Sequence, residues 1–94
     1  MMNVEKPAID ISLVVPCFNE EEVLPETAKR LAEKVESLCV ARIISENSKI
    51  VFVDDGSTDA TWQLIASFHT NNPNRFAGIK LAKNRGHQNA LLCG

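Results

Sequence analysis

The sequence predicts a small α/β domain built on a parallel β-sheet. Stretches with the composition of strands alternate with stretches of helical periodicity. The segment Lys49–Val53 is continuously apolar after its first residue, as in strands that are buried on both faces of a parallel sheet. The length of 94 residues suits one domain with a thin core.

The first predicted strand, Ile9–Val15, is rich in β-branched residues. We expect it to end before Pro16, which lacks the N–H that a sheet ladder needs. Asn19 and Glu22 then have the spacing of a capping-box variant at the start of a helix. Apolar residues recur at intervals of three or four, which predicts one apolar helical stripe. They are Leu24, Ala28, Leu31, Val35 and Leu38.

The second and third units repeat this order. Lys49–Val53 is the second strand, and we expect Ser57 or Thr58 to cap the helix that follows it. That helix contains Trp62, Leu64, Ile65 and Phe68. Phe76–Leu81 is the third strand, Lys83–Gly86 is a loop, and a third helix begins at His87. Such units predict parallel strands joined by right-handed crossovers.

Charge and composition exclude several classes of protein. The net charge is −2 without a basic cluster, which argues against nucleic-acid binding. No apolar run approaches the roughly 18–20 residues that span a bilayer, and no signal-peptide pattern is present. The cysteines, Cys17, Cys39 and Cys93, lack the spacing of a zinc site, so we expect reduced thiols in a cytoplasmic protein.

Polar residues follow all three predicted strands. Ligands of open α/β sheets bind at the carboxyl ends of the strands, so these residues are candidates for a binding site. The candidates are Pro16, Phe18, Asn19, Glu20, Asp54, Asp55, Lys83 and Arg85. The absence of a Walker loop and of a G-x-G-x-x-G segment argues against a P-loop NTPase and a dinucleotide oxidoreductase.

Each candidate has a structural alternative. Asp54 and Asp55 can accept hydrogen bonds from a base or a ribose, or can cap a helix or close an Asx turn. Phe18 can stack on a base, or can pack under its loop. Asn19 and Glu20 can contact ribose, or can cap the first helix.

The basic candidates are Lys83 and Arg85. Arg85 can neutralise a phosphate, and the start of the third helix after Gly86 can bind an anion. The alternative for both side chains is a solvated loop charge. A receiver-type signalling domain is disfavoured, because the acidic pair follows the second strand and no phosphoacceptor acid with a lysine partner ends a central strand.

Three segments together resemble the family 2 glycosyltransferases. They are Leu13–Glu21, Val51–Asp59 and Lys83–Ala90, and the second is the most specific. The resemblance covers Ile9–Gly94 and is greatest to the branch that glycosylates polyprenyl phosphates, such as dolichol-phosphate mannose synthase and bactoprenol glucosyltransferases.

The resemblance implies a partial Rossmann-like glycosyltransferase A-type fold, with parallel strands in the order 3-2-1 and flanking helices. It also implies a UDP-sugar or GDP-sugar donor and, in the parent enzyme, a polyprenyl phosphate or glycan acceptor. The loop after the first strand and the acid after the second would hold the base and ribose. These residues are Pro16, Phe18, Glu20 and Asp55, with Asp54 beside them, while Lys83 and Arg85 would face the diphosphate.

Family members hold Mg²⁺ or Mn²⁺ through an Asp-x-Asp motif, which this sequence lacks. We therefore expect residues 1–94 to be the nucleotide-sugar-binding half of a catalytic domain, without catalytic residues, metal ligands or activity of its own. The alternative is a non-catalytic binding or interaction module. The implied strand order also leaves Ile9–Val15 at an open apolar edge, which predicts self-association.

Overall fold

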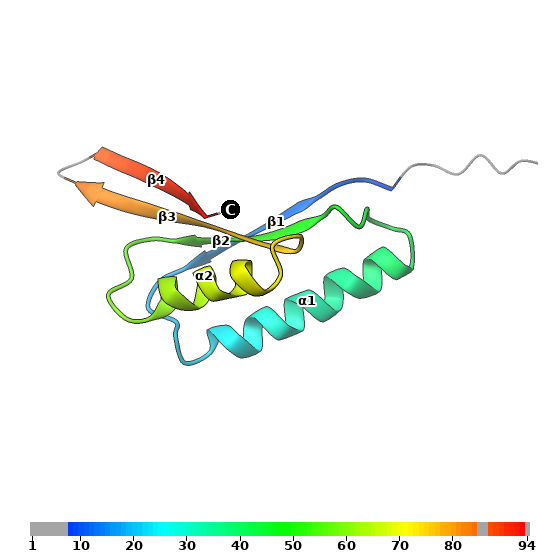
Figure 1. Cartoon of the computed structure of the whole chain (residues 1–94), viewed down its shortest axis with the longest axis horizontal. Helices are drawn as coiled ribbons and strands as arrows, with labels where there is room; N and C mark the ends of the chain where they lie inside the picture. Colours follow the sequence, from blue (N-terminus) through cyan, green and yellow to red (C-terminus); the bar gives the residue numbers. More distant parts are fainter. Residues whose placement is uncertain (1–7, 85–86, 94) are drawn as a thin grey trace, which may run out of the picture.

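The computed structural model describes residues 8–84 and 87–93, with side chains for residues 8–81. Strands and helices alternate as predicted through the first three strands (Figure 1). The elements in the described residues are β1 (Ser12–Cys17), α1 (Leu24–Val40), β2 (Lys49–Asp54), α2 (Thr61–Asn71), β3 (Phe76–Asn84) and β4 (His87–Cys93).

One sheet with the order β1-β2-β3-β4 organises the chain. β1 pairs in parallel with β2, and β2 pairs in parallel with β3. The predicted α/β class, with three neighbouring parallel strands and flanking helices, is therefore confirmed. In the register across the sheet, Cys17 lies beside Asp54, and Asp54 lies beside Lys80.

The segment that begins at His87 is a strand, so the predicted third helix is wrong. β4 pairs antiparallel with β3, which continues past Leu81 to Asn84. Lys83 therefore belongs to a strand and not to the predicted loop. A helix of about two turns has marginal stability alone. Pairing as a strand instead satisfies the outer backbone edge of β3.

β1 continues through Pro16 to Cys17, although the sequence predicted an end at Val15. The carbonyl of Ile11 accepts the N–H of Lys49, the first residue of β2, at 2.9 Å. The carbonyl of Cys17 accepts the N–H of Asp55, the residue after β2, at 3.0 Å. Backbone polar groups alternate in direction along a strand, so Pro16 faces away from β2. Its missing N–H lies on the open edge of the sheet, where it removes no ladder hydrogen bond.

Both helices lie on the same side of the sheet (Figure 1). α1 places its predicted apolar stripe against the sheet, with Leu24, Ala28 and Val35 buried. Alternate residues of β2 are buried on the same side, as the pattern of a one-sided cover requires. The opposite face of the sheet has no helix over it among the described residues.

Three aromatic rings form the centre of the core. Phe52, Phe68 and Phe76 lie with ring centroids 5.6–6.0 Å apart. Gly78 lets α2 approach β3, because a Cβ at this position would collide with Ile65. The core thereby fixes β2 and α2 around the loop that joins them.

Neither helix begins with its predicted cap. The N-cap of α1 is Val23, and that of α2 is Ala60; neither has a side-chain capping bond. Asn19 therefore does not cap α1, and neither Ser57 nor Thr58 caps α2. The polar side chains of these loops instead bond across to one another.

Candidate functional site

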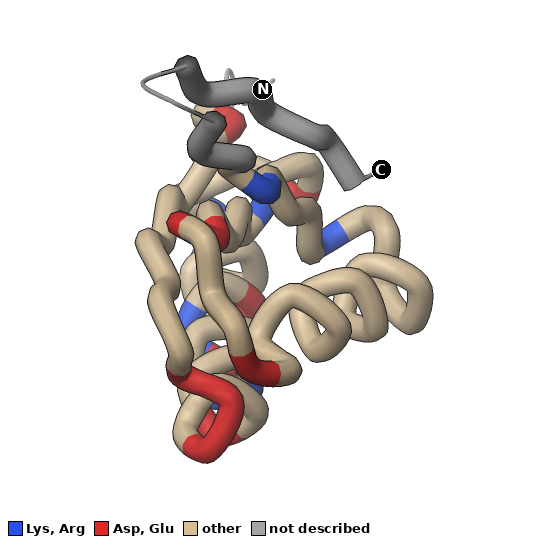
Figure 2. The backbone as a smooth tube through the Cα atoms, turned by 90° about the vertical axis from the view of Figure 1, so that its left-hand side faces the viewer, with Lys and Arg blue, Asp and Glu red and all other residues tan. Residues whose placement is uncertain are grey.

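The carboxyl ends of β1 and β2 bring two loops together at one end of the molecule. Residues 18–23 join β1 to α1, and residues 55–60 join β2 to α2. Figure 2 views the molecule from this end and shows acidic stretches of chain in red. Six acidic residues contribute to the two strand ends and loops. They are Glu20, Glu21, Glu22, Asp54, Asp55 and Asp59.

Reciprocal hydrogen bonds join the two loops. The N–H of Asn19 donates to the hydroxyl of Ser57 at 2.8 Å. The side-chain oxygen of Asn19 accepts the N–H of Thr58, also at 2.8 Å. Asn19 has a φ of 50°, a left-handed conformation that asparagine tolerates better than most residues. These two bonds connect the loops in both directions.

Three further hydrogen bonds extend the connection toward the helices. Glu20 donates its N–H to the hydroxyl of Thr61 at 2.8 Å. Glu21 donates its N–H to Asp59 at 3.3 Å, and its carboxylate accepts the N–H of Ala60 at 2.8 Å. The first turn of α2 is thus bonded to the loop that precedes α1.

Asp54 is fully buried at the end of β2, with 0% of its surface exposed. Its Oδ1 accepts both the N–H of Ser57, at 3.0 Å, and the Ser57 hydroxyl. This is the turn-closing alternative that the sequence left open for Asp54. Its Oδ2 is buried and has no hydrogen-bond partner among the described residues.

Asp55 and Phe18 lie on adjacent strand ends. The N–H of Asp55 donates to the carbonyl of Cys17 at 3.0 Å, and that carbonyl belongs to the peptide that leads into Phe18. Phe18 is 56% exposed, so it does not pack under its loop. Asp55 is half-buried. Among the described candidates, an exposed aromatic ring and a half-buried carboxyl group thus come from neighbouring strand ends.

The remaining candidates of the first loop are Pro16 and Glu20. Pro16 is exposed on β1, and Glu20 is half-buried. A carboxylate oxygen of Glu20 accepts the N–H of Phe18 at 3.3 Å, which helps to hold the turn.

Cys17 lies beneath this loop as a buried, free thiol. Burial, together with the nearby carboxylates of Glu20 and Asp54, raises its pKa to about 11. The thiol is therefore protonated and unreactive at neutral pH, which suits a packing role.

A hollow of about 390 Å³ opens beside the loops. Its lining is mostly acidic, and consists of Asn19, Glu20, Glu21, Glu22, Val23 and Asp59. Within the described part of the chain, no group of three His, Cys, Asp or Glu side chains could hold a metal ion. Because these residues do not fit a metal site, we derive no chemical step through a metal here.

The two basic candidates, Lys83 and Arg85, belong to neither of the two loops described above. β3 extends beyond Lys80, the partner of Asp54, so the backbone of Lys83 lies about 10 Å further along the strand. The Lys83 side chain and all of Arg85 lie outside the described residues.

Sequence reasoning missed Lys80, whose ammonium lies 5.8 Å from the ring centroid of Trp62. The sequence feature that could have identified Lys80 is a single charged residue within the predicted strand Phe76–Leu81.

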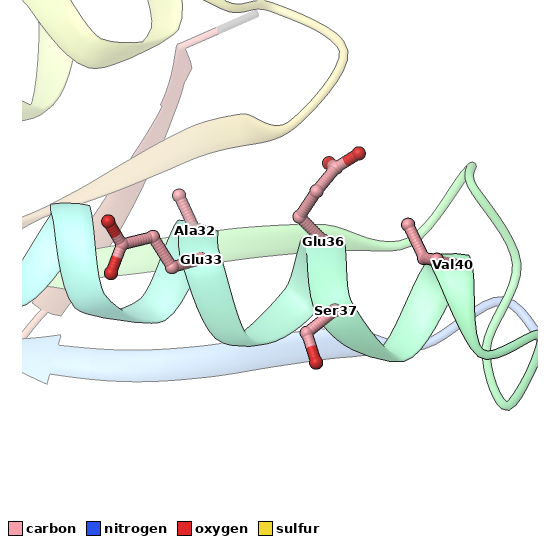
Figure 3. A pocket seen from close by; sticks show the side chains of 5 residues that line it. All are labelled: Ala32, Glu33, Glu36, Ser37 and Val40. Atoms are coloured by element: carbon pink, nitrogen blue, oxygen red, sulfur yellow. The ribbon is translucent and has the colours of Figure 1, made fainter.

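A larger hollow, of about 640 Å³, lies along α1. Figure 3 shows that its labelled side chains extend in different directions from one helix instead of converging. They belong to Ala32, Glu33, Glu36, Ser37 and Val40. This surface lacks a set of polar groups directed at a common point.

In the described part of the chain, no helix is long and apolar enough for a membrane span.

Comparison with known proteins identifies the family. The family model described as Glycosyl transferase family 2 matches residues 12–94. The "uncharacterized glycosyltransferase YkoT" of Bacillus subtilis (strain 168) is 55% identical over 84 residues, which cover 89% of this chain and 25% of YkoT.

Two further relatives are the undecaprenyl-phosphate 4-deoxy-4-formamido-L-arabinose transferases of Yersinia pestis (strain Pestoides F) and Yersinia pseudotuberculosis serotype O:3 (strain YPIII). Each is 28% identical over 93 residues, which cover 99% of this chain and 27% of the relative. The chain thus spans about a quarter of the length of these relatives. With the strand–helix order, the paired loops and the match over residues 12–94 in agreement, the chain belongs to glycosyltransferase family 2.

Proposed function

We propose that residues 1–94 form the nucleotide-recognition half of the catalytic domain of a glycosyltransferase whose donor is a UDP-sugar or a GDP-sugar. The observation that carries this proposal is the Asp55–Cys17 hydrogen bond, which holds an acidic residue beside the exposed ring of Phe18. An exposed aromatic face can stack on a base, and a neighbouring carboxylate can accept hydrogen bonds from a base or a ribose.

The residues divide into contacts and supports. Phe18 and Asp55 contact the base and ribose, with Pro16 and Glu20 on the flank of the same loop. Asn19 and Asp54 hold the two loops together. Lys83 and Arg85 are assigned to the donor diphosphate, because a cationic side chain can neutralise phosphate charge.

The chain does not catalyse transfer by itself under this proposal. A departing nucleoside diphosphate needs charge neutralisation, and an acceptor needs to be oriented. In the whole enzyme, Mg²⁺ or Mn²⁺ supplies part of that neutralisation. The Yersinia relatives are named as undecaprenyl-phosphate transferases, which supports a polyprenyl phosphate acceptor for the whole enzyme. A whole enzyme with such an acceptor would act at the cytoplasmic face of a membrane.

Calorimetric titration of the 94-residue chain tests the proposal. UDP, GDP, UDP-glucose and GDP-mannose are titrated to about 5 mM, with cytidine monophosphate for comparison. We expect one uridine or guanosine diphosphate series to bind, and no labelled sugar to reach a polyprenyl phosphate. Absence of binding by every diphosphate would favour the alternative of a non-catalytic interaction module. Sugar transfer by the chain alone would contradict the inactive half-domain.

We also propose that the chain self-associates through the edge formed by Ile9–Val15. Two exposed apolar residues support this, since Ile9 and Val14 are 67% and 59% exposed. β1 pairs with β2 alone among the described strands, so its other edge presents free backbone donors and acceptors.

A further inference from the structure

The hydroxyl of Ser57 occupies a central place between the two loops. It donates to Oδ1 of Asp54 and accepts the N–H of Asn19 at 2.8 Å. A hydroxyl can do both at once, because it has one donor and two acceptor lone pairs. The buried end of β2 is thereby connected, through one side chain, to the loop that follows β1.

Asn19 completes the connection from the other side. Its side-chain oxygen accepts the N–H of Thr58, so each loop supplies a donor to the other. The left-handed φ of Asn19 turns the chain immediately after Phe18. The backbone that carries the exposed Phe18 is thus held through contacts made by its neighbour Asn19.

We infer that Asp54, Ser57 and Asn19 are positioning residues for nucleotide recognition. Asp54 accepts a hydrogen bond from the hydroxyl of Ser57, and that hydroxyl accepts the backbone N–H of Asn19. The turn at Asn19 then places Phe18 beside Asp55. This inference rests on the proposed function, and it assigns to Asp54 a role that involves no contact with the nucleotide. The full burial of Asp54 supports that role.

The unequal use of the two Asp54 oxygens gives a sharp test. Both bonds from Ser57 go to Oδ1, while Oδ2 has no partner among the described residues. Asp54→Asn keeps the accepting oxygen and removes the charge, whereas Asp54→Ala removes the acceptor. A positioning role predicts that Asp54→Asn binds nucleotide within about twofold of the unchanged chain, and that Asp54→Ala binds about tenfold more weakly.

Substitutions in the loops provide a second test that leaves the buried position intact. Ser57→Ala and Asn19→Ala each remove one connection, and we expect about tenfold weaker binding of the nucleoside diphosphate. Ser57→Thr retains the hydroxyl and should restore binding. Ser67→Ala is the matched control, since its hydroxyl donates within α2, to the carbonyl of Leu64.

Amide hydrogen exchange gives a readout that does not need a ligand. In Ser57→Ala the Asn19 amide should exchange at least about tenfold faster, while the amides of β2 retain their protection. Failure of the unchanged chain to bind any nucleotide would contradict the proposed function and this inference together. Binding that Ser57→Ala and Asn19→Ala leave unchanged, or that Asp54→Asn weakens as much as Asp54→Ala, would contradict this inference alone.

Discussion

The backbone N–H of Asn19 donates to the hydroxyl of Ser57 at 2.8 Å, across 38 positions of sequence. This bond joins the loop after β1 to the loop after β2, where ligands of open α/β sheets bind. The site therefore depends on non-local polar contacts as much as on the apolar core beneath it.

Acid should weaken the outer part of this connection through Asp59. Burial raises the pKa of its carboxyl, but hydrogen bonds from Thr61 and Glu21 outweigh burial and hold the pKa below the ordinary 3.8. A lowered pKa in the folded state stabilises the fold above about pH 4, and this contribution is lost as pH falls further. Urea unfolding between pH 5 and pH 2.5 should show a smaller loss of stability in Asp59→Asn than in the unchanged chain. Asp10→Asn controls for the change of charge, and an equal loss in all three proteins would contradict this assignment.

Gly78 should tolerate no side chain. Gly78→Ala places a methyl group against Ile65 and should lower the free energy of unfolding by about 1–3 kcal/mol. Ala77→Val is the control, since Ala77 lies next in the strand on the face that no described helix covers. Urea denaturation checks both variants. Equal stability of Gly78→Ala and the unchanged chain would mean that α2 does not need its close approach to β3.

Cys17 should react slowly with alkylating agents. Burial and the neighbouring carboxylates raise its pKa from 9.0 to about 11, which lowers the thiolate fraction at pH 8 by about a hundredfold. Iodoacetamide labelling followed by peptide mass spectrometry measures the rate at this cysteine. The same chain in urea provides the reference rate, and similar rates in the two conditions would show that Cys17 is accessible and ionised in the folded protein.

Val14 should govern self-association. Sedimentation of the unchanged chain should reveal larger species as concentration rises, and Val14→Lys should shift them toward the monomer by charging the open edge. Val40→Lys is the matched control, because Val40 is 75% exposed and belongs to α1, not to the edge strand. A monodisperse monomer at high concentration would contradict the proposal, as would an equal effect of the two substitutions.

Periodic patterns predicted the parts of the fold that depend on burial. The stripe from Leu24 to Leu38 places α1 correctly, because its burial repeats with the helical period. The apolar run Lys49–Val53 places β2 correctly, but full burial alternates along this strand, whereas the run indicated burial on both faces. The short segment that begins at His87 was predicted as a helix, and pairing with the edge of β3 makes it a strand instead.

Polar side chains were harder to interpret from the sequence. Asn19 and Ser57 both suit local helix caps, and each instead finds its partner on the other loop. Their real contacts follow from the parallel pairing of β1 and β2, which no local pattern encodes. Lys80 stands out in the sequence as a lysine within a predicted apolar strand, but its position beside Asp54 follows only from the sheet register.

Nuclear magnetic resonance titration of the ¹⁵N-labelled chain with UDP and with GDP locates the nucleotide site residue by residue. We expect one nucleotide to produce saturable shifts, largest at the amides of Phe18, Asn19, Asp55 and Gly56. Shifts confined to the hollow on α1, around Glu33 and Ser37, would contradict the placement of the site. No shift with either nucleotide would contradict nucleotide recognition by this chain.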